Sequence, residues 1–198
     1  MREKESKKIF SEEVAWIKKP DPNNVDDIEA IERIDTQSEV AKWMVGPALT
    51  REDFLEENFY GICGEKDEKG MEGFVYLYDI DGELVDRLIE QKLIDSKDAK
   101  ILEISFARCI DSNASPENRK KGLVSSAVRQ VCFSLLEKEK NVVIVAFTNP
   151  QNLPSEGVLK NAGFIKKGKI LYDKESKVED NFWILDKREL EKVLRKEK

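Results

Sequence analysis

The fold is decided by residues 101–147, ILEISFARCIDSNASPENRKKGLVSSAVRQVCFSLLEKEKNVVIVAF. This stretch begins and ends with apolar, β-prone runs, at residues 101–110 and 142–147, and each run is typical of a buried strand. Between them, residues 124–139 carry apolar side chains at helical spacing, which indicates an amphipathic helix. A strand, a helix and a second strand in this order predict a βαβ unit whose two strands are parallel neighbours.

The regions on either side of this unit complete the predicted sheet. Apolar runs bounded by turn residues predict further short strands, at residues 14–17, 59–63, 73–78, 164–165, 169–172 and 182–185. A helix is predicted to begin at the turn of residues 21–24, where Asn23 or Asn24 is a good cap residue, and another covers residues 155–162 and ends at Gly163. Together these elements predict an α/β protein of the α+β kind, built on a mixed sheet.

The chain shows no mark of a boundary between domains. Its 198 residues are enough for one ordinary domain with a full core, and it contains neither an internal repeat nor a low-complexity linker. We expect a single domain over residues 1–198, with a charged lead-in at residues 1–13, a helical insertion at 83–100 and a charged helix at 187–198.

Charge and hydropathy exclude two classes of partner. The 34 basic residues are outnumbered by 40 acidic ones, which gives a net charge of −6 and argues against nucleic-acid binding. No apolar run approaches the ~20 residues that a membrane helix needs, and the first ten residues, MREKESKKIF, lack the apolar stretch of a signal peptide. We therefore expect a soluble, cytoplasmic protein without a membrane partner.

The side chains available for chemistry are also restricted. The chain has no histidine, which excludes Ser-His-Asp and Cys-His catalysis as well as histidine-ligated metals. Its three cysteines, Cys63, Cys109 and Cys132, form no CxxC pair and are odd in number, so reduced thiols are expected. We expect no metal centre.

The turn between the first strand and the helix has the chemistry of an anion site. Residues 118–128, NRKKGLVSSAV, contain Gly122, which permits an unusual backbone conformation. The first N–H groups of the following helix have no partner within the helix and favour an anion such as a pyrophosphate, and the basic residues 119–121 add positive charge. A polar surface loop in which Ser125 or Ser126 caps the helix is the alternative interpretation.

A second segment makes the turn more informative. Residues 148–164, TNPQNLPSEGVLKNAGF, follow the second strand of the βαβ unit. Together with the turn they resemble the GNAT superfamily of acyl-CoA-dependent N-acyltransferases, whose members pair an R/Q-x-x-G-x-G/A turn with a later N-x-x-S/A-x-x-x-Y-x-x-x-G-F segment. The matching residues are Arg119, Gly122 and Val124 in the first motif and Asn152, Ser155, Gly163 and Phe164 in the second. The order of elements from about residue 14 to 186 matches as well.

The resemblance implies a fold and a co-substrate. It implies a mostly antiparallel sheet, flanked by helices, with two central parallel strands that splay apart and hold the pantetheine arm of acetyl-CoA or another acyl-CoA between them. Strand backbone would bind the arm as an added strand does, helix-turn amides the pyrophosphate, and one asparagine side chain the arm. The implied contact residues are Arg108, Cys109, Ile110, Arg119, Lys120, Lys121, Gly122, Leu123, Val124, Ser125, Asn152 and Ser155.

Two positions depart from the family pattern. Val124 stands where glycine or alanine is usual, and Leu159 stands where many members place the tyrosine that protonates the departing thiolate. Tyr172, Tyr76 and Tyr78 are weaker candidates for that proton donor, since each is also explained as a packing aromatic. These departures leave open an alternative function, a non-catalytic module that binds acyl-CoA and regulates without turnover.

The resemblance also implies an activity, the direct transfer of an acetyl or similar acyl group to a primary amine. Glu103 is the candidate general base, because it interrupts an apolar strand and the run EISF resembles the strand on which related enzymes carry a catalytic glutamate. An acid on the solvent face of the sheet is the alternative. The acid-rich segments 26–57 and 172–181 favour a cationic acceptor, and the insertion at 83–100 covers the acceptor cleft or serves a homodimer contact.

Overall fold

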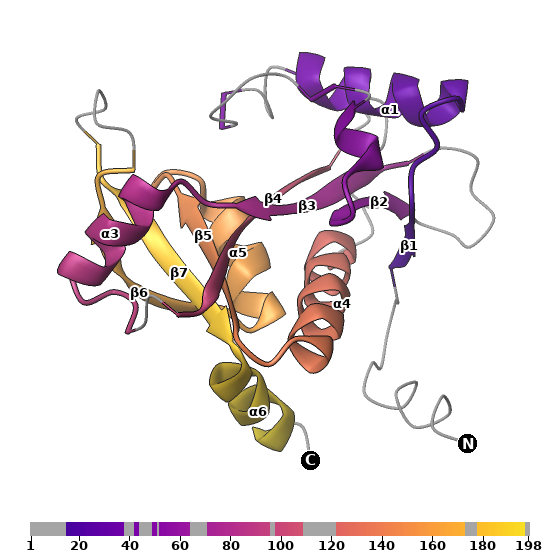
Figure 1. Ribbon diagram of the computed structural model, residues 1–198. Coiled ribbons are helices and arrows are strands. Elements are labelled where there is room, and N and C mark those ends of the chain that lie inside the picture. Colours follow the sequence, from indigo (N-terminus) through magenta and orange to yellow (C-terminus); the bar gives the residue numbers. More distant parts are fainter. Residues whose placement is uncertain are drawn as a thin grey trace, which may run out of the picture. The chain divides into compact units, whose positions relative to one another are not determined.

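The strands and helices follow the chain in an alternating order. The computed structural model describes residues 15–37, 42–43, 49–50, 52–63, 71–95, 98–108, 122–172 and 178–196. The strands are β1 (Trp16–Lys18), β2 (Phe59–Cys63), β3 (Gly73–Asp79), β4 (Lys100–Arg108), β5 (Val142–Thr148), β6 (Ile165–Ile170) and β7 (Asp180–Asp186). The helices are α1 (Val25–Thr36), η2 (Glu52–Leu55, a 3-10 turn), α3 (Gly82–Glu90), α4 (Leu123–Lys138), α5 (Leu153–Ala162) and α6 (Lys187–Lys196) (Figure 1).

The seven strands form one mixed sheet in the order β1-β2-β3-β4-β5-β7-β6. Strands β4 and β5 are parallel neighbours, as expected for the ends of a βαβ unit, and α4 connects them. The pairs β1–β2, β5–β7 and β6–β7 are antiparallel. The prediction of a mixed α/β sheet around a parallel pair is therefore confirmed, and β1 is the edge strand that the apolar stretch near residue 14 indicated.

The chain divides into two compact units. The first comprises Met1–Val75, Phe106–Ala127 and Leu194–Lys198, and the second comprises Tyr76–Ser105 and Val128–Val193. Strands β3 and β4 begin in one unit and end in the other. Each unit has its own set of buried residues.

The first unit is built around α1 and the edge of the sheet. Asn24 caps α1, because its side chain accepts a hydrogen bond from the Asp26 N–H at 2.9 Å. Three rings, Phe54, Phe59 and Phe74, form a buried row with neighbouring centroids 5.5 Å apart. Ring packing of this kind stabilises a core beyond the area that it buries.

The second unit has its core between α3 and the sheet. Leu84 and Leu88 of α3 pack in a cluster with Ile101, Val145, Ile170, Phe182 and Ile184 from four strands. Ile101 lies two residues before Glu103 on β4, and Val145 stands opposite Glu103 in the β4–β5 ladder. Since side chains alternate along a strand, Glu103 lies on the face of the sheet that α3 covers.

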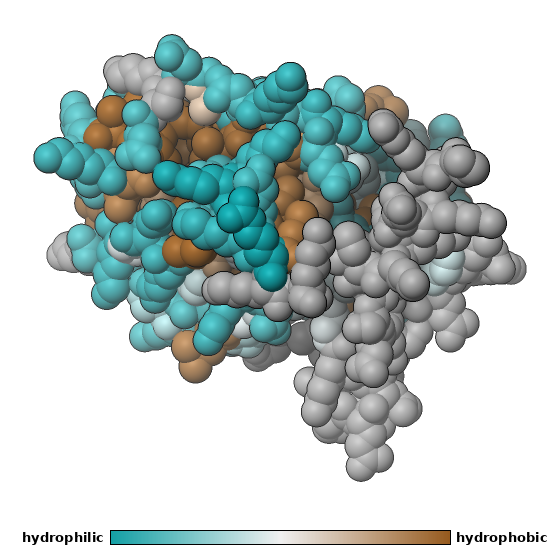
Figure 2. All heavy atoms as spheres, turned by 90° about the horizontal axis from the view of Figure 1, so that it is seen from below, coloured by the Kyte–Doolittle hydropathy of each residue, from teal (hydrophilic) through white to brown (hydrophobic). Residues whose placement is uncertain are grey.

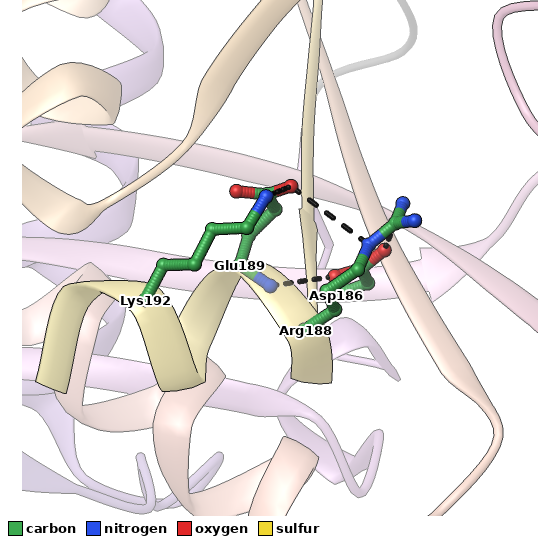
Figure 3. A network of polar contacts seen from close by, with 4 residues as sticks. All are labelled: Asp186, Arg188, Glu189 and Lys192. Carbon is green, nitrogen blue, oxygen red and sulfur yellow. Dashed lines mark hydrogen bonds and ion pairs between the residues drawn. The ribbon is translucent and has the colours of Figure 1, made fainter. Parts of the chain in front are cut away.

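Helices α5 and α6 complete the second unit. Asn152 caps α5 and Gly163 ends it, in the left-handed conformation with φ of 98° that favours glycine. Asp186 caps α6, because its carboxylate accepts the Glu189 N–H at 2.8 Å. Glu189 is itself buried and forms an ion pair with Lys192 (Figure 3).

Three details differ from the sequence-based expectations. The runs at 164–165 and 169–172 form one strand, β6, which has an irregular register between Lys166 and Gly168 and ends before Tyr172. The helix of the insertion ends at Glu90 rather than extending toward residue 100. Helix α4 begins at Leu123, so neither candidate serine occupies the cap position.

The face drawn in Figure 2 is largely polar where it is described. Figure 2 shows one face, on which hydrophilic residues surround smaller hydrophobic patches. Among the described residues, no helix has both the length and the apolar character of a membrane span. The large exposed hydrophobic side chains are dispersed over several elements, at Trp16, Val25, Leu55, Leu153, Ile165 and Val178.

Candidate active site

The parallel ladder at the centre of the sheet ends at Glu103. Strand β4 pairs with β5 from Lys100, opposite Val142, to Glu103, opposite Val145. Among the described residues no further pair joins the two strands, although β4 continues to Arg108 and β5 to Thr148. On its other side β5 stays paired with β7 as far as Thr148. Just beyond Glu103, residues 104–105 of β4 and 146–147 of β5 therefore do not pair with each other, and another strand-like partner could hydrogen-bond to these facing edges.

Glu103 lies in a buried polar group at this point. Its side chain is only 8% exposed, which excludes the alternative of an acid on the solvent face. The Tyr172 hydroxyl donates a hydrogen bond to its Oε2 atom at 3.1 Å. The Tyr78 hydroxyl, from β3, is a second hydrogen-bonding neighbour of the same carboxyl group. In the part of the chain that the structure describes, no lysine or arginine forms an ion pair with Glu103.

Burial decides the protonation of this carboxyl group. Loss of water around Glu103 disfavours its charged form and raises its pKa to about 7. The hydrogen bonds from Tyr78 and Tyr172 act in the opposite direction because they stabilise the carboxylate, and the negative charge of Asp180 adds a further upward contribution. Burial, followed by the charge of Glu103, also raises the pKa of both tyrosines, so their hydroxyls stay protonated. Glu103 can therefore exchange a proton near neutral pH.

Tyr172 is held by contacts on both its ring and its backbone. The ring packs against Phe147 of β5, with centroids 4.6 Å apart. The Arg87 guanidinium, from α3, donates one hydrogen bond to the Leu171 carbonyl at 2.6 Å and another to the Tyr172 carbonyl at 3.2 Å. The helix of the predicted insertion thus contacts the segment that carries a partner of Glu103.

The glycine turn lies in the first compact unit and starts α4. Gly122 has a φ of 85°, which side-chain-bearing residues adopt rarely, while a Cβ there would meet no atom within 4 Å. Its conformation therefore explains the glycine, rather than lack of space. The Gly122 carbonyl accepts the Ser126 N–H at 2.8 Å, which makes Gly122 the residue before the first helical turn.

The first N–H groups of α4 have no acceptor among the described residues. Among the described residues, the N–H groups of Leu123, Val124 and Ser125 have no recorded hydrogen-bond acceptor, as is usual for a helix without a side-chain cap. The Ser126 hydroxyl, a candidate cap from the sequence, instead accepts the Ala15 N–H at 3.3 Å. Helix N-termini with open amides attract anions.

The end of β4 is fixed by an ion pair and a close strand approach. Arg108 pairs with Glu72 at 2.8 Å, and both side chains are half-buried. Gly73 of β3 lies so close to β4 that a Cβ would stand 2.4 Å from the Ala107 carbonyl oxygen. Glycine is therefore required at this position by the neighbouring backbone.

The two residues of the second motif meet at the start of α5. Asn152 is 8% exposed, and its Oδ1 atom accepts the Ser155 N–H at 3.3 Å. Leu159, at the position where the family pattern has tyrosine, is fully buried in the core of α5. Five predicted contact residues fall outside the described residues, namely Cys109, Ile110, Arg119, Lys120 and Lys121.

Comparison with known proteins establishes the fold. No protein-family model matches the chain, and no curated protein matches it. Among solved structures, it is similar to a GNAT-family acetyltransferase from Bacillus anthracis, with 17% identity and a TM-score of 0.62 over 90% of this chain and 98% of that chain. The chain has the GNAT fold.

Two other structures with this fold have more specific names. The ribosomal-protein-S5-alanine acetyltransferase from Vibrio fischeri is 15% identical, with a TM-score of 0.61 over 89% of this chain and 95% of that one. The aminoglycoside acetyltransferase AAC(6')-Ib in complex with coenzyme A and kanamycin is 16% identical, with a TM-score of 0.56 over 91% and 99% of the two chains. Both similarities agree with the fold that the two sequence motifs indicated.

The sequence alone does not indicate which side chains surround Glu103. Tyr172 and Tyr78 were considered as donors to a thiolate, whereas their hydroxyls face Glu103. Arg87 and Asp180 carried no signal, since each lies in a charge-rich segment where a contacting residue looks the same as a solvated one. A polar group in an apolar strand was the one feature that could identify this site.

Proposed function

We propose that this protein is an N-acyltransferase that moves an acetyl or similar acyl group from acyl-CoA to a primary amine by direct attack. The observation that carries the proposal is the coincidence of a buried, ionisable Glu103 with the end of the parallel β4–β5 ladder in a chain of this fold. A polar group buried in a sheet needs partners or a task, and the two tyrosine hydroxyls leave the carboxyl group able to exchange a proton.

The residues present fit acyl-CoA in two respects. The open amides of Leu123, Val124 and Ser125, after the left-handed Gly122, suit a diphosphate. Residues 104–105 of β4 and 146–147 of β5 no longer pair with each other beyond Glu103, and strand edges that face each other in this way suit an amide-containing arm, which can hydrogen-bond as an added strand. When bound, acyl-CoA supplies the activated acyl group as a thioester.

Glu103 is proposed as the general base. An amine is a nucleophile only in its neutral form, and a protonated amine must lose a proton before or during attack. A carboxylate with a pKa of about 7 is ionised in a large fraction of molecules at neutral pH, and it is more basic than an ordinary glutamate. The Tyr172 and Tyr78 hydroxyls orient it by donating to its oxygens.

The acceptor is proposed to be cationic. The negative charge of Asp180 acts on Glu103, so two carboxyl groups lie near each other without a recorded lysine or arginine partner for Glu103 among the described residues. A positive amine would neutralise part of this charge on binding. The two named structures above act on an aminoglycoside and on an alanine of a ribosomal protein, so the fold accommodates small and macromolecular amines.

A thiol-release assay tests the proposal directly. Acetyl-CoA is incubated with the protein and with polyamines, aminoglycosides, lysine or peptides with a free N-terminus, and free coenzyme A is measured. Release that depends on one class of amine is the expected result. Glu103→Gln should abolish most of it, while Glu90→Gln, the same change at an exposed position of α3, should not.

Calorimetry separates the two outcomes that would contradict this function. If acetyl-CoA binds but no amine provokes thiol release, the non-catalytic acyl-CoA module becomes the better description, in agreement with the buried Leu159 at the usual tyrosine position. If acetyl-CoA does not bind at millimolar concentration, neither description holds.

A further inference from the structure

Helix α3 contacts the Glu103 group through one side chain. The Nη1 atom of Arg87 donates to the Leu171 carbonyl at 2.6 Å and its Nη2 atom donates to the Tyr172 carbonyl at 3.2 Å, across 84 and 85 residues of sequence. The planar guanidinium thus holds two successive carbonyls with one fork. A lysine has no such fork and could satisfy only one position well.

Tyr172 needs this support because it lies beyond the regular sheet. The β6–β7 ladder ends at Ile170, opposite Asp180, so the described residues that follow, Leu171 and Tyr172, have no place in it. Phe147 restrains the Tyr172 ring from one side. It does not fix the backbone from which that ring projects, and this is what Arg87 binds.

Tyr172 therefore links two hydrogen bonds. Its carbonyl accepts from Arg87, while its hydroxyl donates to Glu103 Oε2 at 3.1 Å. We propose that Arg87 is a positioning residue, which holds the 171–172 segment so that the Tyr172 hydroxyl stays directed at Glu103. This inference rests on the proposed function for its catalytic meaning, although its structural content can be tested without a substrate.

Helix α3, which carries Arg87, is held in place by its own packing. Leu84 and Leu88, on either side of Arg87 in sequence, are both at most 5% exposed and belong to the core cluster of the second unit. The backbone of Arg87 could therefore move only if the packed helix moved as well. This gives the predicted insertion at residues 83–100 a defined role, which is to support the residue that orients the candidate base.

The groups that act on Glu103 define a readout for this role. They are Tyr78 from β3, Tyr172 after β6 and Asp180 at the start of β7. The Tyr172 hydrogen bond stabilises the carboxylate, so its loss raises the pKa of Glu103. Tyr78 also hydrogen-bonds Tyr172, whereas the hydrogen bonds of Arg87 go to the Leu171 and Tyr172 carbonyls. A purely structural role for Arg87 would lower stability without moving this titration.

The experiment is a double-mutant cycle read by NMR. Proteins labelled with carbon-13 at the glutamate carboxyl carbon are titrated, and the Glu103 signal is assigned by its absence in Glu103→Gln. Tyr172→Phe should raise the Glu103 midpoint by about one pH unit, the value of one hydrogen bond to a charged group. Arg87→Gln should raise it by up to the same amount, and Arg87→Lys by less.

The double variant decides the question. If Arg87 acts through Tyr172, adding Arg87→Gln to Tyr172→Phe shifts the midpoint no further. Shifts that add in the double variant, or an unchanged midpoint in Arg87→Gln beside a shifted one in Tyr172→Phe, would overturn the proposal. Arg188→Gln, an arginine with a 62% exposed side chain, is the matched control and should leave the midpoint unchanged.

Two additions keep the test decisive. Urea unfolding of each variant shows whether it is folded under the titration conditions. If Arg87→Gln is not folded, the same cycle is measured with Arg87→Lys, with and without Tyr172→Phe. Because the titration needs no acyl-CoA, a protein without transferase activity would refute the proposed function but leave the positioning result standing. Where activity is found, the pH profile of kcat/KM should move with the Glu103 midpoint.

Discussion

Two buried glutamates of the same compact unit have different kinds of partner. Glu103 is 8% exposed and Glu189 is 3% exposed. Glu189 stands in the first turn of α6, where Lys192 forms an ion pair with its Oε1 at 2.8 Å and the Arg188 Nε lies 3.9 Å from the same atom (Figure 3). Glu103 has tyrosine hydroxyls in place of cations.

The two environments differ in the way that a structural carboxylate and the proposed general base should differ. In general, a cation beside a carboxylate favours the charged form of that carboxylate. Neutral hydroxyls orient the carboxylate without a full opposing charge, so burial is free to raise the pKa of Glu103 to about 7. A buried carboxyl group with a raised pKa and uncharged partners agrees with the proposed role of Glu103 in proton transfer.

The largest effect is expected for Glu103→Gln in the thiol-release assay. The amide keeps the volume and one acceptor but cannot take up a proton, so kcat/KM should fall by about 10²- to 10⁴-fold, the usual contribution of a general base. The loss should be greatest between pH 7 and the pKa of the acceptor amine, where the wild-type carboxylate is ionised and the amine still needs to lose a proton.

A loss of kcat/KM of less than tenfold at every pH would show that Glu103 is not the general base. Glu103 and Glu189 would then differ in their partners but not in a catalytic role. Glu90→Gln serves as the control, because the same chemical change at an exposed residue of α3 should leave kcat/KM unaltered.

The next effect concerns stability as a function of pH. The pKa of Glu103 is about 7 in the folded protein and near the ordinary value of 4.5 for a glutamate when unfolded, so the folded state binds this proton more tightly. Its contribution to stability is fully present below about pH 4.5 and is lost as the pH rises through 7. Relative to wild type, Glu103→Gln should be more stable at about pH 8, by up to about 3 kcal/mol.

Urea unfolding of both proteins across this range measures the difference. The stabilities should converge below about pH 4.5, where the wild-type carboxyl group is protonated in both the folded and the unfolded state. A variant that is less stable than wild type at alkaline pH would mean that the carboxylate is stabilised by groups beyond those described, and that the contrast with Glu189 is false.

The fold was largely accessible from the sequence. Periodicity and turn residues located each strand of the central βαβ unit to within two residues, and Asn24 and Gly163 marked helix ends correctly. The errors concerned ends of elements, such as the cap of α4, because Gly122 begins that helix by its backbone conformation and leaves no side-chain signature.

The candidate site was accessible only in part. An acid inside the apolar run ILEIS identified Glu103, but alternation cannot tell which face of a sheet a distant helix covers. The answer depends on Leu84 and Leu88 of α3. The contacts of Tyr172 with Glu103 and Arg87 join residues 69 and 85 positions apart, and local patterns contain no information about such pairs.

A smaller effect is expected from the cation beside Glu189. Lys192→Met removes the partner at 2.8 Å and leaves a carboxylate that is almost fully buried, whose Oε2 atom already lacks a hydrogen-bond partner. Uncompensated burial of this kind costs about 1–3 kcal/mol. Glu189→Gln should cost less, about 1 kcal/mol, because it leaves Lys192, with a 57% exposed side chain, in contact with water.

Unfolding free energies of the two variants give this order, and thiol release should remain at the wild-type rate in both. Reduced activity at unchanged stability would assign Glu189 a role in the reaction and contradict its structural interpretation.

The smallest effect is expected from Arg188→Gln. Its side chain is 62% exposed, and its distances of 3.5 Å to Asp186 and 3.9 Å to Glu189 are those of a weak, solvated ion pair. Such pairs contribute about 0–1 kcal/mol and are screened by salt. The variant should therefore lie within about 0.5 kcal/mol of wild type in urea unfolding, and the difference should disappear at high salt. A loss as large as that of Lys192→Met would show that Arg188 contributes as much as Lys192 to the stability of the folded protein.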